Sequence, residues 1–296
     1  MTAFQHTPVL LDEVMNQLNP VSGGVYADVT LGGAGHARAV LEQSAPDGRL
    51  IGTDRDPTAL EAATSALAEF GDRATVRKAR ISELREVLDS LDVDRIDGVL
   101  ADLGVSSVQL DRPERGFSLA KDGPIDMRMD PTQGETALEL IARLDGDELA
   151  NVIYQYGEER RSRRIARVLK EAYEEGSLET TSDLRRAVHR ATGPKRGRID
   201  PSTRTFQALR IAVNEELQDL TEFLRLVPGV LNEGGVVAVI SFHSLEDRIV
   251  KHTFRNDDQL EPLTKKPIVA GDEERASNPR SRSAKLRAAR RTEVSA

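Results

Sequence analysis

The chain has 296 residues, of which 39% are hydrophobic and 30% are charged, and it contains no cysteine. This length suits one large domain or two ordinary ones. The missing cysteines exclude disulfides and thiolate metal sites, which fits a cytoplasmic protein. The longest apolar run, residues 236–242, is far shorter than the ~20 residues of a membrane helix. Residues 1–11 lack the pattern of a signal peptide, so we expect no membrane segment and no secretion.

Basic residues are concentrated in two stretches, although the net charge of −8 argues against a polyanionic partner. Residues 185–210 contain eight Lys or Arg against one acid, Asp200. Residues 275–292 contain seven Lys or Arg and no acid. A charge run is often only a solvated face. Two such stretches in an acidic protein favour a surface for nucleic acid.

The first hundred or so residues alternate between short apolar runs and helix-forming segments. This alternation is typical of parallel strands joined by crossover helices, and therefore predicts a doubly wound α/β sheet. The predicted strands are 25–30, 50–53, 74–77 and 96–100, and the predicted helices are 37–43, 58–70 and 82–91, the last with Ser82 as its N-cap.

After Asp102 the alternation stops, and a helical domain is predicted to be inserted into the sheet domain. We expect a sheet domain formed by 1–103 and 205–296, and an inserted substrate-recognition domain formed by 104–204. The insertion begins with an irregular segment, 104–131, and its predicted helices are 137–144, 147–156, 160–174 and 182–191.

The chain then returns to the sheet domain. The elements predicted there are a helix at 215–227, a strongly apolar strand at 235–242, a helix at 244–254 with a capping box of Ser244 and Asp247, and a long loop at 256–278.

The segment from Gly32 to Gly35 lies where the first predicted strand turns into the first helix. In doubly wound sheets this position faces the ligand, and glycines there allow the backbone to approach it closely. A plain tight turn is the simpler explanation. Asp54 ends the second strand, where a carboxylate can accept hydrogen bonds from both hydroxyls of a ribose. Together these features suit either NAD or S-adenosylmethionine.

The dinucleotide fingerprint G-x-G-x-x-G fails in this chain, because its third glycine would fall on Arg38 or its second on Ala34. Asp102 ends the fourth predicted strand and Asp28 lies in the first. Both acids can contact the cationic methionyl end of S-adenosylmethionine, which we therefore favour over NAD. The alternative for Asp102 is that it only caps the following turn.

Several long motifs occur in a characteristic order, and together they closely resemble the bacterial ribosomal RNA small-subunit methyltransferase H family, also called MraW. The resemblance covers nearly the whole chain. The motifs are residues 6–13, 32–36, 54–57, 102–107, 114–118, 122–130, 156–160, 204–208 and 241–248.

The resemblance implies a Rossmann-like methyltransferase sheet with a helical insertion, and S-adenosylmethionine as methyl donor. It also implies that the acceptor is the exocyclic N4 of a cytidine in small-subunit ribosomal RNA near the decoding site. The cofactor contacts that it implies are Ala34, Gly35, His36, Asp54, Ile81, Asp102 and Gln109. Two of them depart from the family's pattern, which has frequent glycine at position 34 and an aromatic residue at position 81.

The cytosine amine is a poor nucleophile because its lone pair is delocalised into the ring, so the enzyme must position it and accept a proton. Asp102 is our candidate for this acceptor. Phe242 and His243 follow the apolar strand and are candidates to stack on and hydrogen-bond an extruded base, the alternative being purely structural roles. We expect RNA contacts within residues 160–167 and 195–204, and a local, structural ion pair for Arg128.

Two other functions compete with this interpretation, namely an NAD-dependent oxidoreductase and a catalytically silent RNA-binding assembly factor. A hydrolase is disfavoured because Ser241 and His243 lack the G-x-S-x-G motif. The five histidines show no metal-ligand spacing, so we predict no metal site. The sequence leaves open the oligomeric state, and whether free RNA or the assembled small subunit is the substrate.

Overall fold

The computed structural model describes residues 8–193 and 200–292, and the chain divides into two compact units. The first unit comprises Met1–Gly104 and Leu217–Ala296, and the second comprises Val105–Glu216. The chain therefore leaves the second unit later than the expected point at Thr205. The reason is the helix α10, Ser202–Asn214, whose Phe206 and Leu209 are buried in the core of the second unit.

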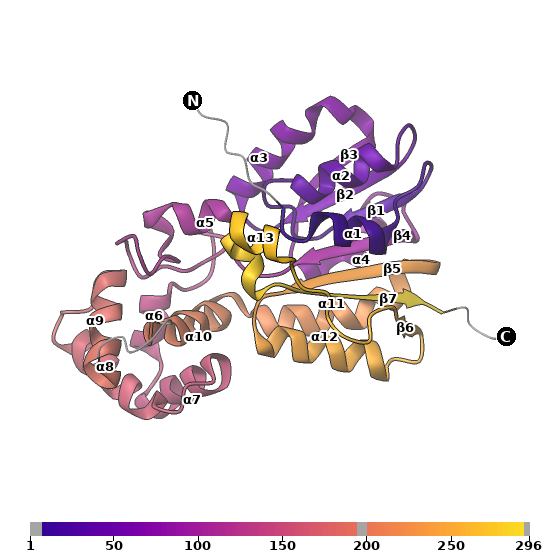
Figure 1. Cartoon of the computed structure of the whole chain (residues 1–296). Coiled ribbons are helices and arrows are strands. Elements are labelled where there is room, and N and C mark those ends of the chain that lie inside the picture. Colours follow the sequence, from indigo (N-terminus) through magenta and orange to yellow (C-terminus); the bar gives the residue numbers. More distant parts are fainter. Residues whose placement is uncertain (1–7, 194–199, 293–296) are drawn as a thin grey trace. The chain divides into compact units, whose positions relative to one another are not determined.

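The first unit contains a seven-stranded sheet with the order β3-β2-β1-β4-β5-β7-β6 (Figure 1). β1 to β5 are parallel, whereas β7 runs antiparallel to both β5 and β6. The predicted doubly wound sheet is thus confirmed. The strands are β1 Val25–Asp28, β2 Arg49–Asp54, β3 Ala74–Lys78, β4 Ile96–Asp102, β5 Leu231–Ser241, β6 Leu260–Pro262 and β7 Lys285–Arg291.

Each face of this sheet has its own apolar core. Val40, Leu41 and Ala63 belong to the core on one face, and Leu88 and Phe223 belong to the core on the other. Burial of such side chains is the main source of stability for both layers. The first face is covered by α1 Leu11–Leu18, α2 Gly35–Gln43 and α3 Pro57–Leu67, and the second by α4 Leu84–Ser90, α11 Glu216–Val230 and α12 Ser244–Asn256 (Figure 1).

Both N-caps proposed from the sequence for the first unit are wrong. Ser82 lies inside a short 3-10 turn, Ile81–Glu83, that precedes α4. The N-cap of α12 is His243, paired with Glu246, and not Ser244 with Asp247. The spacing of Ser244 and Asp247 fits a capping box, but the observed box begins one residue earlier. The side chain of Asp247 instead binds Lys285 and Arg287 on β7.

The predicted loop at 256–278 is also wrong, because it contains β6 and the helix α13, Asp272–Ser277. The basic stretch that follows forms β7, which pairs with β5 from Lys285 to Arg290. Periodicity alone did not predict this strand, since its sequence is dominated by cations. The ion pairs with Asp247 and the ladder to β5 offset the cost of burying Arg287, which is 6% exposed.

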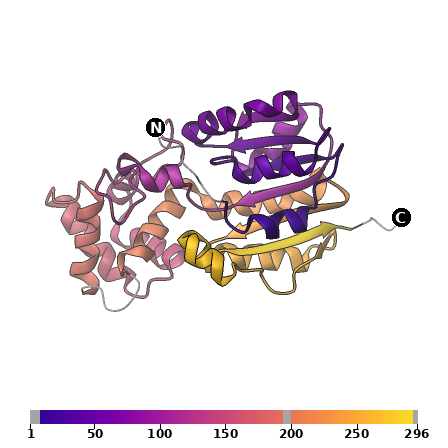
Figure 2. The same cartoon turned by 45° about the horizontal axis from the view of Figure 1, so that its top comes forward.

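The second unit is a bundle of helices with its own core (Figure 2). The helices α6 to α9 lie close to their predicted bounds. Thr136, Asp145 and Thr180 cap α6, α7 and α9, each in a capping box with an acid three positions on. The helices are α5 Ser107–Asp111, α6 Ala137–Arg143, α7 Gly146–Gly157, α8 Ser162–Glu174, α9 Thr181–Thr192 and α10.

The segment between α5 and α6 is largely irregular, as predicted, and is held in place by buried polar side chains. Arg115 donates to the carbonyls of Arg128 and Met129, and Asn214 bonds the backbone of Met127 and Met129. The expected local pair of Arg128 is confirmed, since its guanidinium lies 2.7 Å from the carboxylate of Asp126. Within the two described ranges, no helix combines the length and apolar character that crossing a bilayer requires.

Candidate functional site

The strand order reverses between β1 and β4, which are neighbours at the centre of the sheet. From β1 the chain continues outward to β2, whereas from β4 it continues to β5 on the other side. The connections therefore diverge at the carboxyl edge, which is where open α/β sheets bind ligands. Asp28 ends β1, Asp54 ends β2 and Asp102 ends β4, so their carboxyl groups belong to the same edge.

The glycine-rich turn follows β1 and leads into α2. Gly32 and Ala34 both have left-handed backbone conformations, with φ of 48° and 62°. Ala34 is the N-cap of α2 and supplies no capping side chain, so the helix begins with amide donors directed at this edge. A Cβ added at Gly35 would lie 2.4 Å from Cγ of Pro8. Only glycine fits there without displacing the N-terminal segment.

Asp54 connects the glycine-rich turn to the second strand. Its carboxylate accepts hydrogen bonds from the backbone N–H groups of Gly32 and Asp56, both at 2.9 Å. Burial raises the pKa of Asp54 to about 6, although these N–H donors act in the opposite direction. This position suits the acceptor of ribose hydroxyls that the sequence predicted.

Asp28 is buried and Asp102 is half-buried, and neither has an arginine or lysine among its described contacts. Burial raises the pKa of Asp28 to about 7, with a further contribution from the charge of Asp54. The pKa of Asp102 is raised well above its ordinary value, first by burial and then by the charges of Asp28 and Glu246. Oδ1 of Asp102 is buried and has no hydrogen-bond partner among the described residues. A buried acceptor of this kind is available to a bound ligand.

His36 lies in the first turn of α2 and is 6% exposed. Its Nε2 lies 2.9 Å from the carbonyl oxygen of Val9, and its Nδ1 lies 3.8 Å from Oδ2 of Asp102. The side chain of His36 therefore faces an acid of the candidate site. The family resemblance implied a cofactor contact at this position, but the sequence did not indicate the pairing with Asp102.

The segment that follows β5 brings Phe242 and His243 to the same edge, because β5 pairs with β4 and Ile240 lies opposite Asp102. The backbone N–H groups of both residues donate to the carboxylate of Glu246. Nδ1 of His243 accepts from the N–H of Glu246, and Nε2 is buried with no hydrogen-bond partner in the described part of the chain. Although Nε2 lies 3.2 Å from Oε1 of Glu246, the geometry is not that of a hydrogen bond.

Glu246 was missed by the sequence reasoning, although it organises this segment. The signal was present as the spacing from His243 to Glu246, which is that of a capping box. Histidine is an unusual N-cap, and the adjacent Ser244 matched the expected residue type better.

Ile81 and Gln109 are the two remaining predicted cofactor contacts. Ile81 begins the 3-10 turn after β3 and packs, half-buried, against the core of the first unit. Gln109 lies in α5 of the second unit, where its side chain accepts from the N–H of Ser106 at 2.9 Å. The relation of Gln109 to the other candidates stays a prediction.

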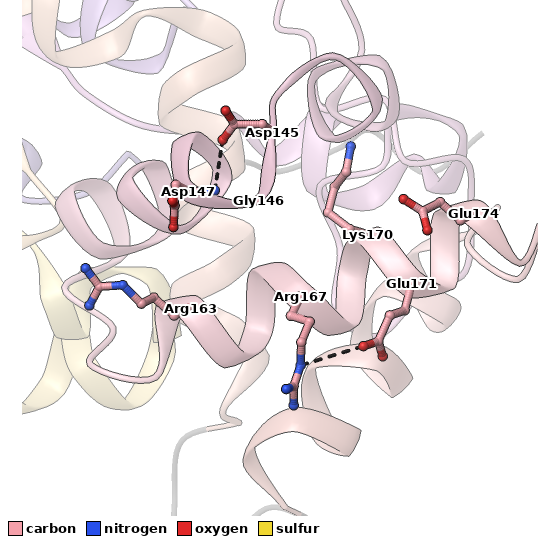
Figure 3. Close-up of a pocket in the computed structure, with 8 residues that line it drawn as sticks. All are labelled: Asp145, Gly146, Asp147, Arg163, Arg167, Lys170, Glu171 and Glu174. Carbon is pink, nitrogen blue, oxygen red and sulfur yellow. Dashed lines mark hydrogen bonds and ion pairs between the residues drawn. The ribbon is translucent and has the colours of Figure 1, made fainter.

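A pocket of about 530 Å³ lies in the second unit (Figure 3). Most of its polar groups already have partners within the unit: Nζ of Lys170 donates to three backbone carbonyls at the end of α6, and Arg167 pairs with Glu171. Acids and bases are mixed around it, so the pocket does not resemble a phosphate site. The lining residues are Asp145, Gly146, Asp147, Arg163, Arg167, Lys170, Glu171 and Glu174.

The edge of the sheet therefore offers acids at three strand ends, a tight turn at the N-terminus of α2, and two buried polar atoms with no hydrogen-bond partner among the described residues. This arrangement favours a ligand with a nucleoside and a positive charge. A dinucleotide would bring the two negative charges of its pyrophosphate to an edge already rich in carboxyl groups, which disfavours the NAD alternative.

Comparisons with known proteins agree with this geometry. The model of the MraW methylase family matches residues 3–292. A protein named ribosomal RNA small subunit methyltransferase H from Sorangium cellulosum is 59% identical, covering 97% of this chain and 91% of its own length. One of the same name from Geobacter sulfurreducens is 51% identical, with 97% and 98% covered. A solved putative rRNA-methylase from Clostridium thermocellum has a TM-score of 0.46 at 13% identity, covering 97% of this chain and 99% of its own. The chain belongs to the MraW methylase family.

Proposed function

We propose that this protein transfers a methyl group from S-adenosylmethionine to the exocyclic N4 of a cytidine in small-subunit ribosomal RNA, near the decoding site, in the cytoplasm. The observation that carries the proposal is the group of acids at the carboxyl edge, Asp28, Asp54 and Asp102, whose pKa values are raised first of all by burial. The curated relatives named as small-subunit rRNA methyltransferases support the acceptor.

The residues at this edge fit the proposed donor. When bound, S-adenosylmethionine supplies an electrophilic methyl group on a positively charged sulfur. Asp54 would accept from its ribose hydroxyls, and Asp28 and Asp102 would face its cationic methionyl end. Ala34, Gly35 and His36 form the turn that approaches it, while Ile81 would pack on the adenine and Gln109 would complete the contacts.

The acceptor base requires groups that hold it and take up a proton. Phe242 offers a ring for stacking, and the unpartnered Nε2 of His243 offers a polar contact to the base. Asp102 is the proposed proton acceptor, since Oδ1 is unpartnered and burial favours its protonated form.

Exposed arginines of the second unit are the proposed contacts to the RNA backbone. Arg160, Arg163 and Arg164 are exposed and have no ion-pair partner among the described residues. They surround the start of α8, which has no acid in its first turn. Cations at a helix N-terminus are unfavourable by themselves, so an anionic partner would relieve this arrangement. Arg204 contacts Glu158 and Glu159, and the rest of the predicted contact region, residues 195–199, lies outside the described residues.

The second basic stretch contributes less to this proposal. Arg287 and Arg291 are each only 6% exposed, and Arg287 pairs with Asp247 inside the first unit. Both side chains are therefore engaged in contacts within the first unit.

The reaction is tested by transfer of labelled methyl groups from S-adenosylmethionine to purified unmodified small subunits and to naked rRNA, followed by nucleoside digestion. We expect the label as N4-methylcytidine, and its loss in Asp54→Ala. Asp94→Ala is the matched control, because Asp94 is 92% exposed. Absence of label on both acceptors would contradict the proposal. Label on only one of them would identify the form of the substrate.

The RNA surface is tested by the salt dependence of binding to a small-subunit rRNA fragment. The double substitution Arg163→Gln and Arg164→Gln should weaken binding and lower the slope of log K against log salt by about 1 for each arginine. Arg143→Gln is the control, since Arg143 is similarly exposed but pairs with Glu135. An unchanged slope in the double variant would place the RNA contacts elsewhere.

A further inference from the structure

We propose that His36 is the proton partner of Asp102, so that the proton released by the methylated amine passes through the Asp102 carboxyl group to Nδ1 of His36. This inference rests on the proposed function and assigns the side chain of His36 a role besides lining the cofactor turn. His36 acts through Asp102 and is therefore a positioning and proton-relay residue.

The hydrogen bond of His36 to Val9 determines which ring nitrogen carries the proton. A carbonyl oxygen can only accept, so Nε2 must donate to it across the distance of 2.9 Å. In the neutral ring Nδ1 then carries the lone pair, and this is the nitrogen that faces Oδ2 of Asp102 at 3.8 Å. A histidine whose tautomer is set by a second hydrogen bond is a common arrangement for proton transfer.

The N-terminal segment that sets this tautomer is itself held on both sides. The N–H of Leu10 donates to Oε1 of Glu274 on α13, at 2.9 Å. Pro8 packs on Gly35, where no side chain would fit. The carbonyl of Val9 is thereby kept within hydrogen-bond distance of Nε2 of His36, whose side chain is almost fully buried.

The charges that raise the pKa of Asp102, besides its burial, come from two acids. Asp28 on β1 and Glu246 on α12 face it, and Asp54 on β2 faces Asp28 in turn. The carboxylate of Glu246 already accepts from the N–H groups of Phe242 and His243. Among these neighbours His36 is a base. Its ring becomes positively charged when it takes up a proton, and the surrounding carboxylates stabilise that charge.

The two oxygens of Asp102 have different surroundings, which suits a relay. Oδ1 is buried, has no hydrogen-bond partner within residues 8–193 and 200–292, and is available to the amine, whereas Oδ2 faces His36. In the transfer the N4–C bond forms as the S–C bond breaks, and the sulfur keeps the electron pair. N4 then releases one proton to Oδ1, while the proton that the neutral Asp102 carboxyl group carries on Oδ2 passes to Nδ1 of His36 and from there to solvent. The separation of 3.8 Å must shorten for this step, as is common when a site closes on its ligands.

The first test needs no activity. In the full chain without cofactor, nitrogen NMR of the histidine rings should show His36 protonated at Nε2 and not at Nδ1. In Asp102→Asn the pH midpoint of its ring signals should fall by about one unit or more, because a neighbouring carboxyl is lost. His36→Gln assigns the signals, and those of the exposed His252 should not change. Protonation at Nδ1, or identical titrations in both proteins, would overturn the inference.

The second test compares kinetic parameters. His36→Gln keeps a donor for the carbonyl of Val9 but cannot take up a proton, so kcat should fall about tenfold or more near neutral pH. The KM for S-adenosylmethionine should stay within about twofold, and the loss should shrink at higher pH. A loss confined to KM, independent of pH, would indicate a structural role only. If the unmodified enzyme methylates no RNA, the proposed function fails, whereas the NMR result still decides the pairing of His36.

Discussion

Asp102 in the first unit and Asp200 in the second are aspartates of similar exposure, 19% and 12%, with opposite surroundings. Asp200 accepts from Ser202, His189 and Arg185, and these hydrogen bonds outweigh burial and lower its pKa. The pKa of Asp102 is raised, first by burial and then by the charges of Asp28 and Glu246. The fold thus pairs the Asp200 carboxylate with an arginine and leaves Asp102 without an arginine or lysine among the described residues.

The difference separates a structural acid from a functional one. Asp200 joins α9 to the start of α10, and its charge is satisfied by residues of the same unit. Asp102 lies at a ligand-binding edge, where a raised pKa and an unpartnered oxygen cost stability in the free protein. A cationic ligand would supply the positive charge that no described arginine or lysine supplies there. The contrast between the two aspartates therefore favours a cofactor with a sulfonium group.

The largest effect is expected from Asp102→Asn. If Asp102 accepts the proton, methyl transfer should fall by about 100-fold or more, while the free energy of unfolding should not fall. Rate measurements with labelled cofactor, together with urea unfolding near pH 8, check both parts. Asp94→Asn, on the exposed surface, should leave both unchanged. Near-normal activity in Asp102→Asn would show that Asp102 is not the proton acceptor.

Asp200→Asn should have the opposite profile. It removes the ion pairs with Arg185 and His189, so the free energy of unfolding should fall by about 1–2 kcal/mol near neutral pH. Because the pKa of Asp200 is lowered in the folded state, its stabilising contribution is present above the unfolded pKa of about 4 and is lost as the pH falls further. Urea unfolding at several pH values measures this, with the exposed Asp147→Asn as the control. Equal stability at all pH values would show that the pairs contribute nothing.

The pH dependence of cofactor binding sharpens the comparison further. The pKa values of about 6 for Asp54 and about 7 for Asp28 mean that both carboxyl groups ionise over a range near neutrality. A cation binds better to the ionised forms, so affinity for S-adenosylmethionine should rise about tenfold across this range. Calorimetric titration checks it, and S-adenosylhomocysteine, which lacks the sulfonium charge, should show a weaker trend. An equal trend for both ligands would contradict this reading of the acids.

The smallest effect is expected for the stability of Asp28→Asn. Because the pKa of Asp28 is raised in the folded state, the ionised carboxyl group destabilises the free protein as the pH rises through about 7. The variant should therefore gain about 1 kcal/mol in the free energy of unfolding above this pH and nothing well below it. Denaturant unfolding of the cofactor-free protein at two pH values tests this. A loss of stability at both would mean that the hydrogen bonds from Thr30 matter more than the charge.

The central part of the fold could be predicted because its signals are local. The first four strands and the helices between them alternate over short distances. The helices α6, α7 and α9 begin at capping residues that can be recognised in the sequence. The C-terminal strands could not be predicted in the same way. β7 is rich in cations and becomes a strand only by pairing with β5 and by contacts between Arg287 and Asp247.

The sequence by itself determined that Asp28, Asp54 and Asp102 come at strand ends, and the parallel topology places those ends at one edge. Only the tertiary structure decided what surrounds each acid: the carbonyl of Val9 behind His36, Glu246 beside Asp102, and the absence of a described cationic partner there. The physical reason is that protonation and hydrogen bonding depend on distances and burial between residues far apart in the chain. The periodicity of the sequence does not predict those distances.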